Sequence, residues 1–566
     1  MKKDWHELVS QAKYSIKEER DIYVPMRDGV RLALNIFKPD GRGKFPAIVS
    51  LSPYVKDSQD GYWLPPQSID KPLWDGCIEA GDTGYIVPRG YVHIIADHRG
   101  SGKSEGGFGP KTSIGQDGYD LVEWVAKQPW CDGNVGMMGY SAYSQSQFFT
   151  AVEQPPHLKA IFFSGTAPDA YRGLAYTGGI LCLFIRGLEK TCGTSGQCYR
   201  EYVPITMQTL PKEEVECRRQ ELLNNRDIRY CPNAYQMLHF PNKNPRFFDA
   251  MMNPYDGPYW WALSPYRHAN KVKIPTYLCS PWGHFFMPVG IFKLFDGLKG
   301  PKKLMFTQHR HDARPWRTAL DVQLRWYDHW LKGIDTGIMD EPPLSLFIFG
   351  SNQWRYEKEW PLPGTKWVKF YLRCWEGLSS EEPEIFSDEP DCFLQQPLHL
   401  SLKKDSVRYV TPPLPEDLQV IGPAAFYFYA SIDQDDTNWI VKLFDLDEKG
   451  SEVRYLGTSY LKASHRALDK RMSKPYAPWH PHTKESIEVI KPGEIYEYAI
   501  ELLPIGNVFK AGHRIKLEIF SMEHGKDPEM IDHYHPHVCS SKTTVHKIYR
   551  DKEHPSHLLL PVIPKK

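Results

Sequence analysis

Between residue 45 and about residue 165, short apolar strands alternate with helix-like stretches, and this alternation constrains the fold more than any other feature of the sequence. Strands are predicted within 46–54, 91–100, 134–144 and 158–165, and helices over Gly118–Gln128 and 144–154. Strands that alternate with helices pair in parallel, and the helices cross over the faces of the sheet. The pattern therefore predicts a doubly wound, mostly parallel α/β sheet.

Three further regions surround this pattern. Residues 20–60 contain two β-rich stretches around the turn at Asp28-Gly29. Helix-like stretches fill 166–265, the α/β pattern returns over 266–338, and short strands with turns follow, as in a β-sandwich of jelly-roll type. We predict an α/β core over 1–165 and 266–338, a helical cap over 166–265, and a C-terminal jelly roll over 339–566.

Composition excludes several classes of function. Lys plus Arg (69) equals Asp plus Glu (69), so the chain lacks the basic excess of a nucleic-acid-binding protein. No run reaches the ~18 apolar residues of a transmembrane helix, and the N-terminus has no apolar signal core. We therefore expect no nucleic-acid or membrane partner and a cytoplasmic location. Eleven cysteines are too sparse for a disulfide scaffold, although Cys192 and Cys198 are close enough to pair if oxidised.

The short motif Gly139-Tyr140-Ser141 ends one of the predicted strands. A serine on a tight strand-to-helix turn exposes its Oγ above the edge of the sheet, and the helix after it directs N–H groups toward an oxyanion. The usual second glycine of such a turn is replaced by Tyr143. On this motif alone, an ordinary turn serine remains an open interpretation.

Two other strand ends carry polar side chains. Tyr54 follows the first apolar run, where its hydroxyl can donate to an oxyanion, although a packed surface tyrosine gives the same pattern. The loop from Asp97 to Gly106 contains several glycines and short polar residues. Its spacing is not that of a phosphate-binding loop, so we predict a structured turn.

Several longer motifs together resemble the cocaine esterase-like hydrolases, which sit with the X-Pro dipeptidyl-peptidases. They are SPY at 52–54, ADHRGSGKSEGGF at 96–108, QDGYDLVEWVAKQPWCDGNVGMMGYSAYSQ at 116–145, YDGPYWWALSPYRHANKVKIPT at 255–276, SIDQDDTNWIVKLFDLDEKG at 431–450 and NVFKAGHRIKLEIFS at 507–521. The resemblance spans about residues 20–560. It implies an α/β-hydrolase core, a helical cap and a C-terminal jelly roll.

The resemblance also implies roles for individual residues. Ser141 matches the nucleophile, Tyr54 matches the tyrosine whose hydroxyl helps the oxyanion hole, and the backbone N–H of Ala142 is the second donor. Members of the family usually have Tyr and Gly where this chain has Ala142 and Ser144. Loss of the aromatic side chain beside the nucleophile puts the shape of the substrate in doubt more than the chemistry.

The general base is expected after the predicted strand 302–306. The family there reads roughly Gly-Pro-Trp-x-His, and this chain has Thr-Gln-His309-Arg-His311. The resemblance thus assigns His311 as the base that takes the Ser141 proton and returns it to the leaving group. His309 is a weaker candidate, and a structural role for His311 is the alternative.

The acid position departs from the family. The family reads roughly Gly-Trp-x-Asp, whereas this chain ends the same motif with His284. An aspartate there would fix the tautomer of the base and stabilise its protonated form. His284 can form an atypical Ser-His-His constellation, or Asp312 or Asp256 can replace the acid. In a third interpretation hydrolysis is lost, and the pocket binds a ligand or uses His284 and His311 as acid and base.

Two groups of histidines also permit a metal interpretation. One is the tail group, and the other is the set of histidines around the active site. The tail has no second ligand cluster, so we predict a solvated loop there. Because Ser141 and Tyr54 match the nucleophile and the oxyanion-hole tyrosine of the family, we predict no metal and no cofactor at the active site. The two groups are His524, His533, His535, His537 and Cys539, and His284, His309 and His311.

These observations predict an enzyme. We expect a serine hydrolase that cleaves or transfers the acyl group of a small ester, thioester or amide through an acyl-enzyme on Ser141. The cap residues Trp260 and Trp261 favour an aromatic substrate, and the family leaves room for a homodimer. A non-hydrolytic isomerase, cyclase or lyase of the same fold, or a ligand-binding pseudo-hydrolase, remains the alternative.

Overall fold

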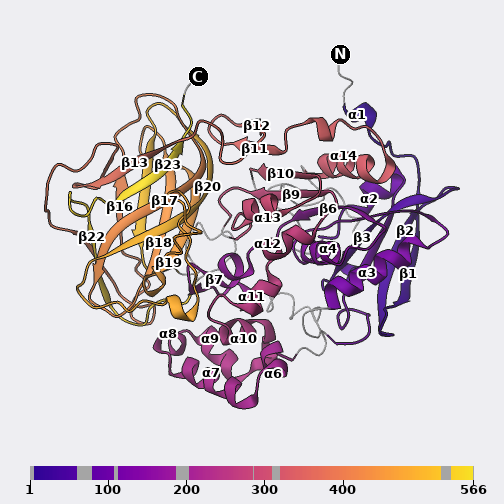
Figure 1. Cartoon of the computed structure of the whole chain (residues 1–566), viewed down its shortest axis with the longest axis horizontal. Coiled ribbons are helices and arrows are strands. Elements are labelled where there is room, and N and C mark those ends of the chain that lie inside the picture. The colour runs from indigo at the N-terminus through magenta and orange to yellow at the C-terminus, as the bar shows by residue number, and fades with distance from the viewer. Residues whose placement is uncertain are drawn as a thin grey trace.

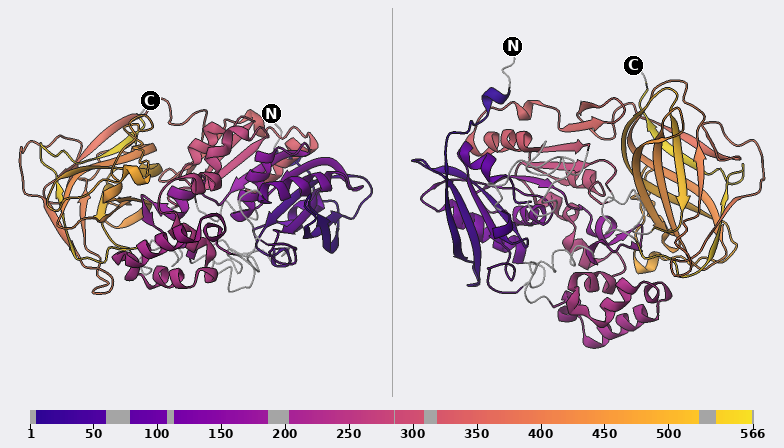
Figure 2. Two further views of the ribbon diagram at one scale, coloured as in Figure 1. Left: turned by 60° about the horizontal axis from the view of Figure 1, so that its bottom comes forward. Right: turned by 180° about the vertical axis from the view of Figure 1, so that it is seen from behind.

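The computed structural model describes residues 5–59, 79–107, 113–186, 203–284, 286–308, 319–523 and 537–564. Figure 1 shows three parts: an α/β core at the right, helices of a cap at the bottom, and a β-sandwich at the left. The same three parts remain distinct in the two further views of Figure 2. Within the described ranges, no helix is both long and apolar enough to cross a membrane.

The core is built on one ten-stranded sheet with the order β1-β2-β4-β3-β5-β6-β9-β10-β11-β12. Pairing is parallel from β4 to β11, and the outer pairs are antiparallel. This is the α/β class that the alternating pattern predicts. The strands are β1 Ile16–Pro25, β2 Arg31–Pro39, β3 Phe45–Ser52, β4 Val92–Asp97, β5 Cys131–Met137, β6 Leu158–Ser164, β9 Thr276–Pro281, β10 Lys302–Thr307, β11 Leu344–Ile348 and β12 Gln353–Glu357.

Helices cover both faces of this sheet, which is why its central strands are nearly continuous apolar runs. Val49 of β3 belongs to the cluster that includes residues of α3 (Ser113–Ala126) and α4 (Ala142–Glu153). The adjacent Ile48 belongs to the opposite cluster, with residues of α14 (Ala319–Lys332). Side chains that alternate along β3 therefore reach two separate apolar layers.

The first two strands of the predicted sandwich region, 339–566, pair with the core sheet. Residues 344–348 are predicted to lie in the sandwich, but Leu344 and Leu346 pair in parallel with β10, and β12 then pairs antiparallel with β11. The core sheet therefore continues through Glu357. A short apolar strand can pair with either sheet, and in this fold it pairs with the edge of β10.

The cap lies between β6 and β9. It starts with a π-helical turn at Ala170–Ala175 and the small hairpin of β7 and β8, and continues as short helices. Among the described residues, four cap α-helices begin with proline, which fits the first helical turn because it lacks the N–H that would be unpaired there. The elements are β7 Tyr176–Thr177, β8 Ile180–Leu181, α6 Ile205–Thr209, α7 Lys212–Asn224, α8 Arg226–Arg229, α9 Pro232–His239, α10 Pro245–Met252, α11 Pro258–Leu263 and α12 Pro265–His268.

The C-terminal part is an antiparallel β-sandwich centred on β17 (Leu418–Ile432), which pairs with β20 (Tyr496–Phe509) and β23 (His557–Val562). It is attached to the core through Phe349, whose N–H donates to Gly506 (3.0 Å) and whose carbonyl accepts from Val508 (2.9 Å). The other strands are β13 Lys366–Arg373, β14 Gly377–Ser379, β15 Asp391–Gln395, β16 Ser406–Val410, β18 Asn438–Leu446, β19 Glu452–Lys462, β21 Arg514–Phe520 and β22 Thr544–Tyr549.

Candidate active site

Ser141 lies at the sharp turn between β5 and α4, as predicted. Its backbone has φ 62° and ψ −119°, a strained conformation for a residue other than glycine. The turn is held by two backbone bonds, from the Ser141 N–H to Ser164 (3.0 Å) and from the Tyr140 N–H to Glu79 (2.8 Å). The half-buried Ser141 side chain is thereby fixed at the carboxyl edge of the sheet.

Two small residues make this turn possible. Gly139 has φ 121°, and a Cβ there would lie 2.5 Å from the Cβ of Tyr143. Ser144, in place of the family glycine, is fully buried. Its Oγ lies 2.9 Å from the carbonyl oxygen of Gly139 and 2.6 Å from that of Ser164, and it accepts the Ser164 N–H at 2.8 Å. The serine therefore fits because it ties the turn to β6.

Tyr54 is brought to Ser141 because β3 and β5 are neighbours in the sheet. Its hydroxyl lies 3.2 Å from the Oγ of Ser141. The Tyr54 ring packs edge-on against Tyr143, with ring centres 6.1 Å apart. Tyr143 is 1% exposed, so the residue that replaces the motif's second glycine supports Tyr54 from within the core.

The loop after β4 has the structural role predicted for it. The buried carboxylate of Asp97 accepts the backbone N–H groups of Lys56 (2.7 Å) and Lys103 (3.0 Å), which joins this loop to the segment that carries Tyr54. Burial raises the pKa of Asp97 to about 6. Gly102 lies directly against this carboxylate, where a Cβ would be 2.1 Å from an oxygen.

His98 stabilises the turn through Ser146, a role that no sequence pattern indicated. Its Nε2 lies 2.8 Å from the hydroxyl of Ser146, and that hydroxyl lies 3.0 Å from the carbonyl oxygen of Ala142. Burial lowers the pKa of His98 to about 3, so the imidazole is neutral at physiological pH. Ala142 opens helix α4, whose first N–H groups point toward the turn.

His284 follows β9 and is 9% exposed. The preceding Trp282 docks on the sandwich, where a Cβ on Gly506 would lie 2.6 Å from the indole. The Phe286 N–H donates to the Nδ1 of His284 at 3.4 Å, and the two rings meet edge-to-face at 4.5 Å. When a neutral His284 accepts this hydrogen bond at Nδ1, its ring proton is on Nε2.

Several predicted residues lie outside the described part of the chain. They include the proposed base and one alternative acid. The other alternative acid, Asp256, is buried and accepts from Arg172 (2.8 Å) and from the indole N–H of Trp261 (2.9 Å). This ion pair disfavours Asp256 as the missing acid. The residues outside are Cys192, Cys198, His309, His311, Asp312, His524, His533 and His535.

The predictions for the environments of Trp260 and of the tail residue His537 need correction. Trp260 is 2% exposed and packs in the cap core rather than forming a pocket wall, because its N–H binds the carbonyl of Asn253 (2.8 Å). The tail residue His537 is buried rather than solvated, and its Nδ1 lies 3.0 Å from Glu523. Among the described residues, no group of three or more His, Cys, Asp or Glu is placed to hold a metal ion.

Comparison with known proteins agrees with this architecture. The model of the X-Pro dipeptidyl-peptidase (S15 family) matches residues 28–313, and that of the X-Pro dipeptidyl-peptidase C-terminal non-catalytic domain matches residues 336–559. The chain belongs to the S15 family. Like the esterases and peptidases among its S15 relatives, it is a serine hydrolase with an α/β-hydrolase core.

Individual S15 relatives are similar over most of their length. Cocaine esterase from Rhodococcus sp. (strain MB1 Bresler) is 26% identical and aligns over 96% of this chain and 98% of its own. A putative Xaa-Pro dipeptidyl-peptidase of Bacillus anthracis is 23% identical over 88% of this chain and 81% of its own. The crystal structure of a CocE/NonD family hydrolase from Staphylococcus aureus has a TM-score of 0.73 and 24% identity, and covers 97% of this chain and 94% of its own.

Proposed function

We propose that this protein cleaves or transfers the acyl group of a small ester, thioester or amide through an acyl-enzyme on Ser141. The observation that carries the proposal is the 3.2 Å approach of the Tyr54 hydroxyl to the Oγ of Ser141 on its strained turn. A hydroxyl donor beside a nucleophile at the start of a helix is the arrangement that acyl transfer requires.

In the proposed reaction, the Oγ of Ser141 attacks the carbonyl carbon while His311 takes the hydroxyl proton. The tetrahedral oxyanion accepts hydrogen bonds from the Tyr54 O–H and the Ala142 N–H. When the intermediate collapses, His311 returns the proton to the departing alcohol, thiol or amine. Water, or another acceptor, then attacks the acyl-enzyme and frees Ser141.

His284 limits what the site can do. An aspartate presents an acceptor to the base, whereas His284 uses its Nδ1 as an acceptor for Phe286 and has a donor at Nε2. To support a base, His284 has to change tautomer and give up the Phe286 bond. This bond is long, at 3.4 Å, and is therefore weak. We therefore propose a weak triad suited to activated acyl groups.

The direct test is intact mass after exposure to a fluorophosphonate, with Ser141→Ala as the matched control. We expect one label per chain in the native protein and none in the variant. Unlabelled, folded protein would contradict the acyl-enzyme and favour a histidine-driven or ligand-binding role. In that case the screen for substrates would look for rearranged rather than cleaved products.

Restoring the family acid tests the role of His284. Because an aspartate accepts from the base and stabilises its protonated form, we expect His284→Asp to raise the hydrolysis of simple esters. A fall of about tenfold, close to 1.4 kcal/mol in the barrier, would show a role that a carboxylate cannot fill.

A further inference from the structure

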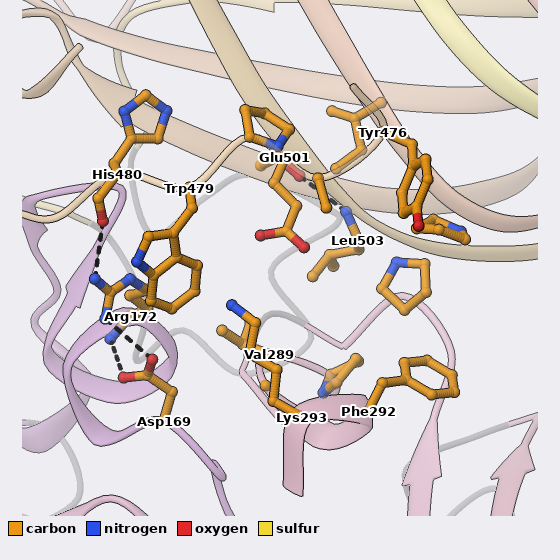
Figure 3. Close-up of a pocket in the computed structure, with 18 of the residues that line it drawn as sticks. Asp169, Arg172, Val289, Phe292, Lys293, Tyr476, Trp479, His480, Glu501 and Leu503 are labelled. Carbon is orange, nitrogen blue, oxygen red and sulfur yellow. Dashed lines mark hydrogen bonds and ion pairs between the residues drawn. The ribbon is translucent and has the colours of Figure 1, made fainter. Parts of the chain in front are cut away.

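A cavity of about 270 Å³ lies between helix α13 (Ile291–Gly297), the start of the cap and the sandwich (Figure 3). Its described lining does not include Ser141, Tyr54 or His284, so it is distinct from the candidate active site. The walls are mainly aromatic and apolar, with Val289, Phe292, Trp360, Tyr476, Trp479 and Leu503. The exposed Asp296, Met472 and Lys474 also line it, which places its opening to solvent on that side.

Two opposite charges face this cavity from different parts of the fold. Lys293 extends from α13 and Glu501 from β20, and Figure 3 shows both side chains pointing into the same space. Within the described part of the chain, neither head group has an ion pair or a side-chain hydrogen bond. The Nζ of Lys293 instead lies 3.0 Å from the centre of the Trp479 ring.

Lys293 is the more buried of the two groups, and burial lowers its pKa to about 8. Glu501 is exposed and lines the cavity, so a ligand can reach its carboxylate. The two side chains attract one another without a direct ion pair, and a ligand that carries both charges can contact both of them.

We propose that this cavity is a second ligand site, which binds a small zwitterion with an apolar side chain, such as a free amino acid or a dipeptide. The carboxylate of the ligand faces Lys293, its ammonium group faces Glu501, and its side chain packs on the aromatic walls. A ligand with one charge leaves either Lys293 or Glu501 unpaired. The cavity volume of about 270 Å³ is close to the lower end of the range for small-molecule sites, about 300 Å³. This volume limits the ligand to the size of an amino acid or a dipeptide.

The experiment is calorimetric titration of the full chain with L-leucine, L-phenylalanine and two matched derivatives of leucine. N-acetyl-L-leucine lacks the ammonium group, and L-leucinamide lacks the carboxylate. We expect saturable binding of a free amino acid and at least tenfold weaker binding of each derivative. Equal binding of the derivatives, or no saturable binding up to about 10 mM ligand, would overturn the proposal.

Variants locate the ligand. Glu501→Gln keeps the shape of the side chain, and Lys293→Met keeps an apolar contact with Trp479; each is expected to weaken amino-acid binding at least tenfold. Glu497→Gln, on the same strand but outside the cavity lining, and Ser141→Ala are expected to bind as the native protein does. Thermal unfolding checks each fold, and if Lys293→Met does not fold, Glu501→Gln carries the test. Unchanged affinity of folded Glu501→Gln would refute the site.

Discussion

Replacing Tyr54 by phenylalanine tests the oxyanion hole with the loss of a single oxygen atom. The hydroxyl lies 3.2 Å from the Oγ of Ser141, longer than the ~2.7 Å of a good O–H···O bond, so this contact contributes little in the resting enzyme. In the transition state the same hydroxyl would donate to a full negative charge. The loss is therefore expected in turnover and not in substrate binding.

The expected magnitude follows from that difference. Removing one donor of an oxyanion hole costs about 10²–10³-fold in kcat, or ~2.7–4 kcal/mol. The remaining donor, the Ala142 N–H, is part of the backbone and stays in place. The ring of Tyr54 still packs on Tyr143, so the free energy of unfolding should change by less than ~1 kcal/mol.

The assay is steady-state hydrolysis of p-nitrophenyl esters, with kcat and KM determined separately. Tyr427→Phe is the matched control, because the Tyr427 hydroxyl donates to the Pro475 carbonyl (2.8 Å) in the sandwich. A fall in kcat of less than about threefold, or a change confined to KM, would refute the role of Tyr54, since a transition-state contact lowers kcat and kcat/KM together.

Three further predictions concern the support of the site. Gly139→Ala should lower the free energy of unfolding by at least ~1–3 kcal/mol and reduce activity, because φ is 121° and the new Cβ meets Tyr143; a urea titration matching the native protein would contradict this. Lys56→Met should cost ~1–3 kcal/mol in thermal unfolding, since the buried Nζ binds Asp57 at 2.6 Å, and an unchanged midpoint would argue against it. The native state holds the Asp97 proton more tightly than the unfolded chain, so this group lowers stability as pH rises from 3.8 to about 6. Asp97→Asn removes this term. The free energy of unfolding in urea of the variant, minus that of the native protein, should therefore rise by about 3 kcal/mol from pH 4 to pH 7. A difference that stays constant over this range would contradict the prediction.

The sequence by itself determined the class of fold and the positions of the central residues. Apolar strands and amphipathic helices are local patterns, so the α/β core follows from alternation along the chain. Ser141 and Tyr54 follow neighbouring parallel strands, and the carboxyl ends of such strands meet at one edge. Their approach is therefore a consequence of topology, which the family motifs already implied.

Only the tertiary structure decided which partner each segment takes. The strand Leu344–Ile348 has the same pattern as a sandwich strand, and the open edge of β10 draws it into the core sheet. Asp256 is indistinguishable in sequence from a catalytic acid until Arg172 is seen to hold it. Lys293 and Glu501 come from separate parts and meet at a cavity that forms only when the sandwich docks. Local patterns fix elements through backbone geometry, whereas these pairings depend on packing between residues far apart in the chain.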